Sequence, residues 1–402
     1  MRSAAAQYAS FLRLPDVGRL LAMAVLARMP IGTVTLALLL HVRALTGSFA
    51  AAGAAVGSYL AASAITAPLI GRFIDRHGPR IALLVTGIAS PAALLVLWLA
   101  KPLGLTTPLL WIVAAFAGAF SPPISVLTRT MWRYRFADEA ARRMAFALDG
   151  VLIEFTFTAG PALIALLLAI GSPTVAFGAA FVFMTLAVPT FIASPALRYW
   201  RHDPHAERHL LGPLTERRLI AVYATTFLLT VAFGLLEVGY PGFAAKVQRP
   251  PLAGILIAVN SVGSALGGLV YGALNLATPR ERQLRIAIAL LVLPLALQGA
   301  IATAGILAIV AFVAGLCIAP TFTIVTLLIS SYAPARYATE AFTWSATCIV
   351  SGIGAGNALG GVLLERYDPA IVFGASGAAA LLATGCAFML SRVPRPALQK
   401  PG

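Results

Sequence analysis

Three charged residues that could form ion pairs or carry protons lie inside long apolar stretches of the sequence. Arg28 lies within residues 20–42, LLAMAVLARMPIGTVTLALLLHV, and Asp149 and Glu154 lie within residues 144–168. A lone arginine at the centre of a membrane helix costs about 2.5–3.5 kcal/mol on insertion scales, so such residues usually face a cavity and pair with a counter-charge. Arginine stays protonated in proteins, whereas a buried carboxylate can take up and release a proton.

Apolar stretches of this length recur along the whole chain. Of 402 residues, 60% are hydrophobic and 11% are charged, and the mean hydropathy is +0.90. A helix of about 20 apolar residues crosses the hydrocarbon core of a bilayer, and stretches this continuous lack the alternation of a membrane β-barrel. The sequence therefore predicts an all-α polytopic membrane protein. Its twelve transmembrane helices are expected at residues 20–42, 49–73, 80–100, 108–131, 144–168, 173–192, 218–240, 251–274, 285–302, 306–331, 341–364 and 370–390.

The basic residues are distributed unevenly between the loops that join these helices. With the N-terminus in the cytoplasm, most arginines fall on the cytoplasmic side. The opposite side has only Arg43, Lys101, Lys246, Arg249 and Arg366. Because loops rich in Lys and Arg stay in the cytoplasm, both termini are expected there. The expected location of this multi-pass protein is the plasma membrane, of the bacterial inner-membrane type. The net charge of +15 is then a consequence of topology, and no nucleic-acid partner is expected.

A polar segment at residues 193–217 divides the predicted helices six and six. The two halves share residues in the same order: Gly71 matches Gly272, Pro79-Arg80 matches Pro279-Arg280, and AGPAL at 159–163 matches AGNAL at 355–359. These matches predict two pseudo-symmetric six-helix bundles, residues 1–192 and 218–402, joined by a cytoplasmic linker. Two such halves are typical of a transporter that rocks around a site near the membrane midplane.

The linker contains a group of residues that could bind a metal ion, His202, Asp203, His205 and His209. A solvated, charged linker is the favoured interpretation, so we expect no metal and no other cofactor. The sequence also shows no phosphate-binding glycine loop, which argues against direct use of ATP.

The loop between the second and third predicted helices, GRFIDRHGPR at residues 71–80, has an ordered set of glycines and charges. It resembles the signature loop of the major facilitator superfamily, with Gly71, Asp75, Arg76, Gly78 and Arg80 in the places of the motif. The resemblance implies that this loop holds the two halves together on the cytoplasmic side when the transporter faces outward. Asp75 could accept hydrogen bonds from Arg76, from Arg80 or from the N-terminus of a neighbouring helix. Residues 271–283 form a second copy that lacks the aspartate, so we expect a one-sided latch.

The subfamily is indicated only in part. Gly160-Pro161 resembles the core of a motif of drug:proton antiporters, although the motif's other glycines are absent. The superfamily pattern implies that the first, fourth, seventh and tenth helices line the substrate cavity and that the fifth, eighth and eleventh lie between the halves. Scattered polar candidates for substrate contacts on these helices are Thr35, Ser121, Tyr223, Asn260, Thr321 and Asn357. Each of them could instead be a packing residue.

The buried charges are the candidates for ion or proton coupling. Arg28 lies at a membrane depth between those of Asp149 and Glu154, and we expect it to pair with Glu154. The competing partners are Asp149 and an anionic group of the substrate. Glu154 is the first candidate for proton coupling, and a structural charge pair is the alternative. Glu237, near the outer end of the seventh helix, is the remaining buried-acid candidate, either as part of an outer gate or at a solvated helix end.

These features favour a secondary active transporter that exports a small organic compound in exchange for protons. The alternative is a proton symporter or facilitator for uptake of a polar organic solute. An enzyme or a receptor is less favoured, because neither a catalytic cluster within the spans nor a large domain outside them is present in the sequence. The expected partners are the substrate, protons and the lipid bilayer, and the protein is expected to be a monomer.

Overall fold

The regular secondary structure of the protein is helical. A computed structural model describes residues 4–200, 212–249 and 251–392. The first half contains α2 (Val17–Thr46), α3 (Phe49–His77), α4 (Pro79–Trp98), α5 (Thr107–Ala119), α6 (Ile124–Arg135), α7 (Glu139–Ile170) and α8 (Pro173–Ala193). The second half contains α9 (Arg217–Lys246), α10 (Pro251–Ala273), α11 (Arg280–Leu297), α12 (Ala304–Tyr332), α13 (Ala338–Arg366) and α14 (Pro369–Arg392). With α5 and α6 counted as one, twelve helices are long and apolar enough to cross a membrane, which confirms the predicted all-α membrane fold.

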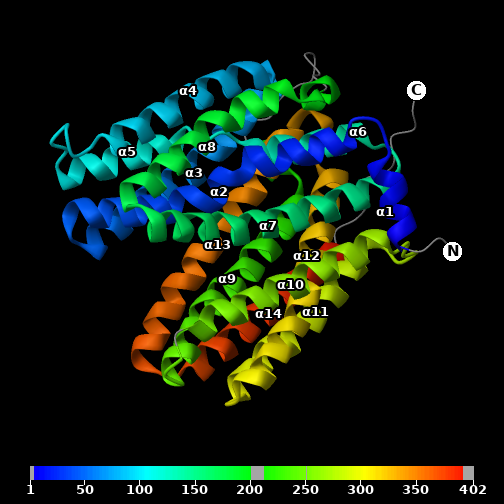
Figure 1. Ribbon diagram of the computed structural model, residues 1–402. Helices are drawn as coiled ribbons and strands as arrows, with labels where there is room; N and C mark the ends of the chain where they lie inside the picture. Colours follow the sequence, from blue (N-terminus) through cyan, green and yellow to red (C-terminus); the bar gives the residue numbers. More distant parts are fainter. Residues whose placement is uncertain (1–3, 201–211, 250, 393–402) are drawn as a thin grey trace.

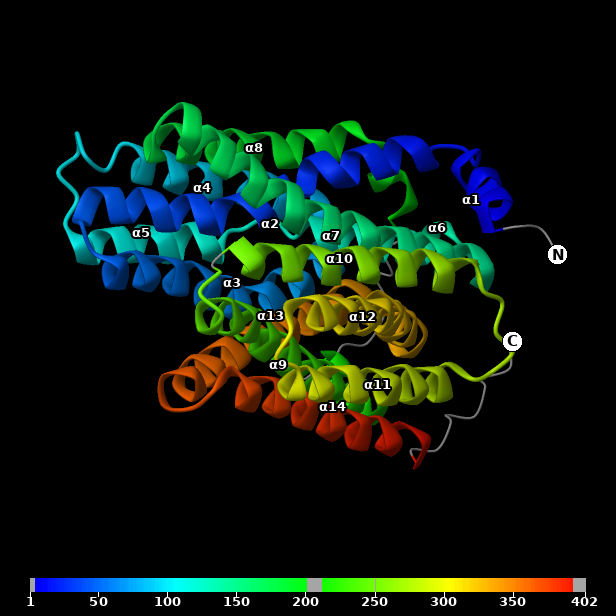
Figure 2. The ribbon, with the colours of Figure 1, turned by 60° about the horizontal axis from the view of Figure 1, so that its bottom comes forward.

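The helices form two groups that lie at an angle to each other. In Figure 1, α2–α8 and α9–α14 come together at the end where α1 and α6 lie, and they splay apart toward the opposite end. Figure 2 shows the same two groups one above the other, with α10 and α13 at the boundary between them. We call the end that holds the turn between α3 and α4 the loop face, and the opposite end the far face. The exact limits of two separate domains remain a prediction.

The predicted fourth helix, residues 108–131, is broken in the structure. Residues 120–123, Phe-Ser-Pro-Pro, lie outside both α5 and α6. The prediction of one continuous helix was wrong because two consecutive prolines remove two backbone donors and clash with the preceding turn. Side chains take over the freed carbonyls: Ser90 Oγ donates to the oxygen of Ala117 at 2.9 Å, and Thr66 Oγ1 donates to the oxygen of Ala119 at 2.8 Å.

Paired glycines bring helices into backbone contact at equivalent places in the two groups. A Cβ on Gly32 of α2 would lie 2.2 Å from the oxygen of Thr156 in α7, and a Cβ on Gly160 would lie 2.6 Å from the oxygen of Gly32. In the second group, a Cβ on Gly234 of α9 or on Gly356 of α13 would come within 2.3 Å of a carbonyl oxygen of the other helix. Gly160 and Gly356 are the glycines of the matched AGPAL and AGNAL segments. The internal repeat therefore preserves a close helix crossing in each group.

A short helix that the sequence analysis did not predict, α1 (Ala4–Leu12), crosses from the first group to the second. Tyr8 Oη donates to the oxygen of Leu269 in α10 at 2.7 Å, and a Cβ on Gly272 would lie 2.2 Å from that hydroxyl. Burial raises the pKa of Tyr8 to about 12, so its hydroxyl remains a donor at neutral pH. The N-terminal helix thus adds a contact between the groups at the loop face.

The glycine crossing in the first group predicts a sharp difference between two glycines of one helix. Gly32→Ala is expected to destabilise the protein by about 1–3 kcal/mol, because the added methyl group meets backbone rather than a side chain that can rotate. Gly18→Ala in the same helix is the matched control, since nothing lies within 4 Å of its Cβ position and alanine favours helix. Thermal unfolding of the purified variants measures both effects. Equal midpoints for the two variants would contradict the close crossing.

Candidate functional site

A buried cluster of three charged side chains lies inside the first group. Arg28 Nη2 of α2 donates to Asp149 Oδ1 of α7 at 2.6 Å, and Arg129 Nε of α6 donates to Asp149 Oδ2 at 3.3 Å. The Arg28 side chain is 0% exposed, that of Asp149 3% and that of Arg129 13%. One carboxylate thus holds two arginines from different helices. We call Arg28, Arg129 and Asp149 the charge cluster.

The expected pairing of Arg28 with Glu154 was wrong, and the competing partner Asp149 takes its place. The two carboxylates are five positions apart on α7, so they point roughly 140° away from each other around the helix. Asp149 faces α2 and α6, whereas Glu154 faces α10 of the other group. Arg129 lies near the end of the predicted fourth helix, where the sequence indicates a cytoplasmic charge and not a buried one.

Glu154 joins the two groups near the middle of the molecule. Its Oε1 accepts a hydrogen bond from Ser264 Oγ of α10 at 2.9 Å. The Ser261 hydroxyl, one turn earlier on α10, and the carboxylate of Glu237 are neighbouring groups of Glu154. A carboxylate in this place can bind its serine partners only as an acceptor, so its protonation would alter a contact between the groups.

The predicted signature loop contacts the other group at the loop face. Both Asp75 oxygens accept backbone N–H groups at the N-terminus of α13, from Thr339 at 3.0 Å and from Glu340 at 2.7 Å. This is the helix-terminus partner anticipated for Asp75. A carboxylate is favourable there because it satisfies free N–H groups and faces the positive end of the helix dipole. A Cβ on Gly71 would lie 2.5 Å from Thr343 Oγ1, so the loop packs closely on α13.

Arg72, which the sequence analysis did not single out, supplies the second part of this latch. Its Nη2 and Nε donate to Glu340 Oε1 at 2.6 and 3.1 Å, and the Glu340 side chain is 0% exposed. Gly78 has a φ of +82°, a conformation that favours glycine in the turn before α4. Arg76 is half-buried and Arg80 is exposed. The loop therefore contacts α13 through Gly71, Arg72 and Asp75.

The second copy of the loop also bridges the groups, so the expectation of a one-sided latch was wrong. Arg280 Nη2 lies 2.5 Å from Glu139 Oε1 at the start of α7, and Arg143 Nη2 donates to Asn275 Oδ1 at 3.5 Å. The Glu139 side chain is 67% exposed. Solvated ion pairs typically contribute about 0–1 kcal/mol, so the buried contacts of Asp75 and Glu340 are the stronger side of the latch.

The six polar residues expected in the substrate cavity fall into two sets. Thr35, Ser121, Asn260 and Asn357 are half-buried, whereas Tyr223 and Thr321 are buried. The buried hydroxyls are already used, since Tyr223 Oη donates to the oxygen of Ala341 at 3.0 Å and Thr321 Oγ1 donates to that of Cys317 at 2.6 Å. Within the second group, Asn357 Nδ2 lies 3.4 Å from Glu237 Oε2. Roles of these residues in substrate binding remain predictions.

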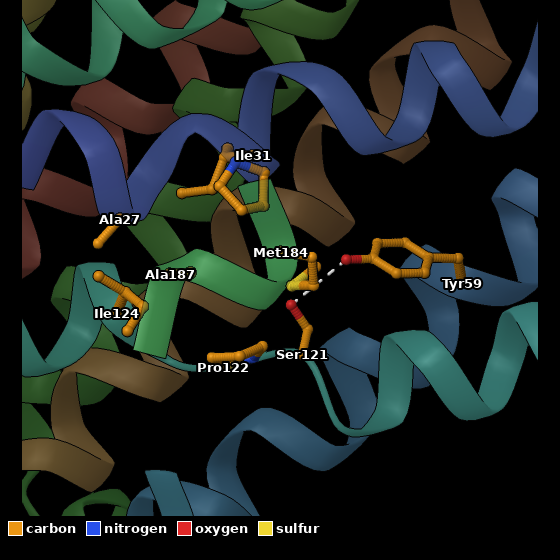
Figure 3. A pocket seen from close by; sticks show the side chains of 9 residues that line it. Ala27, Ile31, Tyr59, Ser121, Pro122, Ile124, Met184 and Ala187 are labelled. Atoms are coloured by element: carbon orange, nitrogen blue, oxygen red, sulfur yellow. Dashed lines mark hydrogen bonds between the residues drawn. The ribbon is translucent and has the colours of Figure 1, made fainter. Parts of the chain in front are cut away.

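The helix break in the first group borders a small cavity (Figure 3). Tyr59 Oη lies 3.3 Å from Ser121 Oγ at its edge, and Met184 and Ile31 line its apolar side. Its volume is about 40 Å³, far below the ~150 Å³ of a cavity that binds benzene. An organic compound therefore does not fit there in this conformation. The linker residues His202, Asp203, His205 and His209, considered above as metal ligands, lie outside the described residues.

The contacts between the groups define the conformation. At the loop face the groups are joined by Asp75 and Arg280. Nearer the middle they are joined by Glu154 and by Thr347, whose Oγ1 donates to the oxygen of Ala64 at 2.9 Å. Toward the far face the groups diverge (Figure 1). The protein is thus closed at the loop face.

Comparison with known families agrees with this architecture. The model of the Major Facilitator Superfamily matches residues 20–236 and 222–402, which together cover nearly the whole chain. The chain belongs to the Major Facilitator Superfamily. Members of this superfamily are membrane transporters, and the fold supports secondary transport of small molecules by alternating access. No curated protein matches the chain.

Solved structures of superfamily members share the fold at low sequence identity. A bacterial homologue of the iron transporter ferroportin in an outward-facing state has a TM-score of 0.77 and 13% identity, over 94% of this chain and 100% of that one. The transporter FucP in the outward conformation has a TM-score of 0.72 and 11% identity, over 95% and 100%. The human organic anion transporter MFSD10 (TETRAN) has a TM-score of 0.70 and 17% identity, over 93% and 100%. Such identities establish a common fold only.

The charge cluster predicts an unequal response to loss of its members. Asp149→Asn leaves two buried arginines without a counter-charge and is expected to destabilise the protein by about 3–5 kcal/mol. Arg28→Gln is expected to cost less, because Arg129 still pairs with Asp149, and adding Arg28→Gln to Asp149→Asn should recover part of the loss. Thermal unfolding of the three purified variants measures this order. A double variant less stable than Asp149→Asn would contradict the proposed charge balance.

The latch predicts local exposure of the start of α13. Asp75→Asn weakens a helix cap worth about 1 kcal/mol, so amide exchange in residues 335–345 is expected to become roughly five-fold faster. Hydrogen–deuterium exchange with mass spectrometry measures this change.

Asp368→Asn is the matched control for the latch. Asp368 Oδ1 accepts the N–H of Ala370 at 2.9 Å within one group, and the hydrogen bond from Lys246 holds the pKa of its carboxyl below the usual value. The control also removes a helix-capping charge, and its effect should stay near residue 370. Faster exchange of residues 335–345 in the control, or none in Asp75→Asn, would contradict the role of the latch.

Proposed function

We propose that this superfamily member is a proton-coupled exporter of a small organic compound, with Glu154 as the coupling carboxylate. The observation that carries the proposal is the hydrogen bond from Ser264 Oγ to Glu154 Oε1, which links the two groups near the middle of the molecule. Most other polar contacts of α7 described above lie closer to the loop face. A titratable group at this point can couple its proton to the relative position of the groups.

The distribution of basic residues sets the orientation of the protein in the membrane for the proposed cycle. The loop face, rich in arginine, is assigned to the cytoplasm, so that the present conformation faces outward. A proton taken from outside neutralises Glu154 and weakens its acceptance of the serine hydrogen bonds. The loop face then opens, Glu154 releases the proton to the cytoplasm, and the compound binds. Reclosure restores the bond to Ser264 and carries the compound outward.

Asp149 is the less suitable coupling group. It is held by Arg28 and Arg129 inside one group, so loss of its charge would leave two arginines unpaired without changing a contact between the groups. Glu237 is bound by Asn357 within the second group. Glu154 differs from both because its partners come from the opposite group.

Proton coupling is tested with purified protein in liposomes that enclose a pH indicator. Candidate compounds are added under an imposed pH gradient, and compound flux and internal pH are recorded together. The unaltered protein is expected to move compound and protons in opposite directions. Glu154→Gln is expected to lose compound-driven proton movement by at least about ten-fold, because the amide cannot titrate.

Glu237→Gln is the matched control for this assay, and it should keep the coupling. Unchanged proton movement in Glu154→Gln would contradict the proposal. Movement of protons and compound in the same direction would instead support an uptake symporter.

A further inference from the structure

The charge cluster carries more positive than negative charge. Arg28 and Arg129 share the single carboxylate of Asp149, at 2.6 and 3.3 Å. All three side chains are buried or nearly so, and ionic attraction is strongest where water is excluded. The cluster therefore retains one net positive charge and can attract an anion.

Two hydrogen-bond donors of Arg28 are unsatisfied among the described residues. Its Nε and Nη1 are buried and have no hydrogen-bond partner in the part of the chain that the structure describes, while Nη2 binds Asp149. A buried polar group without a protein partner is uncommon in folded proteins and is usually met by ordered water, an ion or a ligand. Guanidinium N–H groups match the oxygens of carboxylates and phosphates, so an anionic group would suit these two donors.

An aromatic contact between the groups lies one helical turn from Asp149 of the cluster, toward the loop face. Phe146 lies three residues before Asp149, on the same face of α7 and one turn nearer to the loop face. Its ring packs edge-on against Phe342 of α13, with the ring centroids 6.3 Å apart, and both side chains are at most 2% exposed. Since Phe342 belongs to the other group, opening the loop face separates the two rings.

We propose that Arg28 binds the anionic group of the transported compound when the loop face is open, so that the substrates are organic anions with an apolar body. The proposal rests on the transport function proposed above. The acid group lies against Nε and Nη1 of Arg28, and the apolar body lies against the rings that the opening exposes, Phe146 and Phe342. Asp149 neutralises one arginine and keeps the empty site stable.

Ligand-dependent thermal unfolding of the purified full-length protein in detergent tests this assignment. Sodium fluoride is replaced in steps, at constant ionic strength, by sodium benzoate or by sodium chloride, and benzamide is the uncharged analogue of benzoate. Benzoate is expected to raise the unfolding midpoint in a saturable way, by about 2–4 °C, because a ligand that binds the folded state stabilises it. Benzamide and chloride are expected to have no saturable effect.

Three variants identify the site. Arg28→Gln is expected to lose the response to benzoate, while its remaining Arg129–Asp149 pair keeps the protein folded. Arg28→Lys, which retains the charge without the guanidinium fork, is expected to need several-fold more benzoate. Arg19→Gln, at an exposed arginine of the same helix as Arg28, should respond as the unaltered protein does.

Several results would overturn the assignment. The unaltered protein could show no saturable response to benzoate, or Arg28→Gln could respond to benzoate as strongly as the unaltered protein. A response to chloride equal to that to benzoate would indicate a site for inorganic anions. Each of them leaves the proton assay of Glu154→Gln unaffected, because that assay reads internal pH. Failure of the anion site is therefore distinguishable from failure of proton coupling.

Discussion

A charged side chain placed among apolar helices must find a partner, and this requirement organises the interior of the protein. Arg28 is fully buried and is held by Asp149, while Glu340 is fully buried and is held by Arg72. The two pairs differ in where the partner comes from. The first lies within one group of helices, whereas the second joins the two groups. The first can therefore persist through a conformational change, while the second must break when the loop face opens.

The packing within and between the groups supports the same distinction. Inside each group, glycines let two helices meet backbone to backbone, as Gly32 and Gly160 do in the first group. Such close packing favours a fixed arrangement of the helices within a group. Between the groups, the polar contacts described above are made at the loop face and, nearer the middle, by the carboxylate of Glu154 and the hydroxyl of Thr347. Rigid groups joined by a limited set of breakable contacts are suited to rigid-body alternation.

The sequence predicted the membrane fold well because long apolar stretches leave little choice of structure. The order of glycines and charges in residues 71–80 likewise identified the latch, although its partner on α13 could be known only from the tertiary structure. The break after α5 was missed because the apolar pattern continues through Pro122 and Pro123. The predicted partner of Arg28 was wrong because Asp149 and Glu154 lie at similar depths relative to Arg28. The direction in which each carboxylate points depends on how α7 is rotated against its neighbours.

In the proposed cycle, protonation of Glu154 favours opening of the loop face and closing of the far face. Spin labels at Leu103 and Tyr367, exposed residues in far-face loops of the two groups, can report the distance across that opening in a background lacking Cys317, Cys348 and Cys386. Lowering the pH from 8 to 5 should shift the unaltered protein toward shorter distances. Glu154→Gln should show the short distances at both pH values. A Glu154→Gln protein whose distances change with pH as those of the unaltered protein do would contradict the claim.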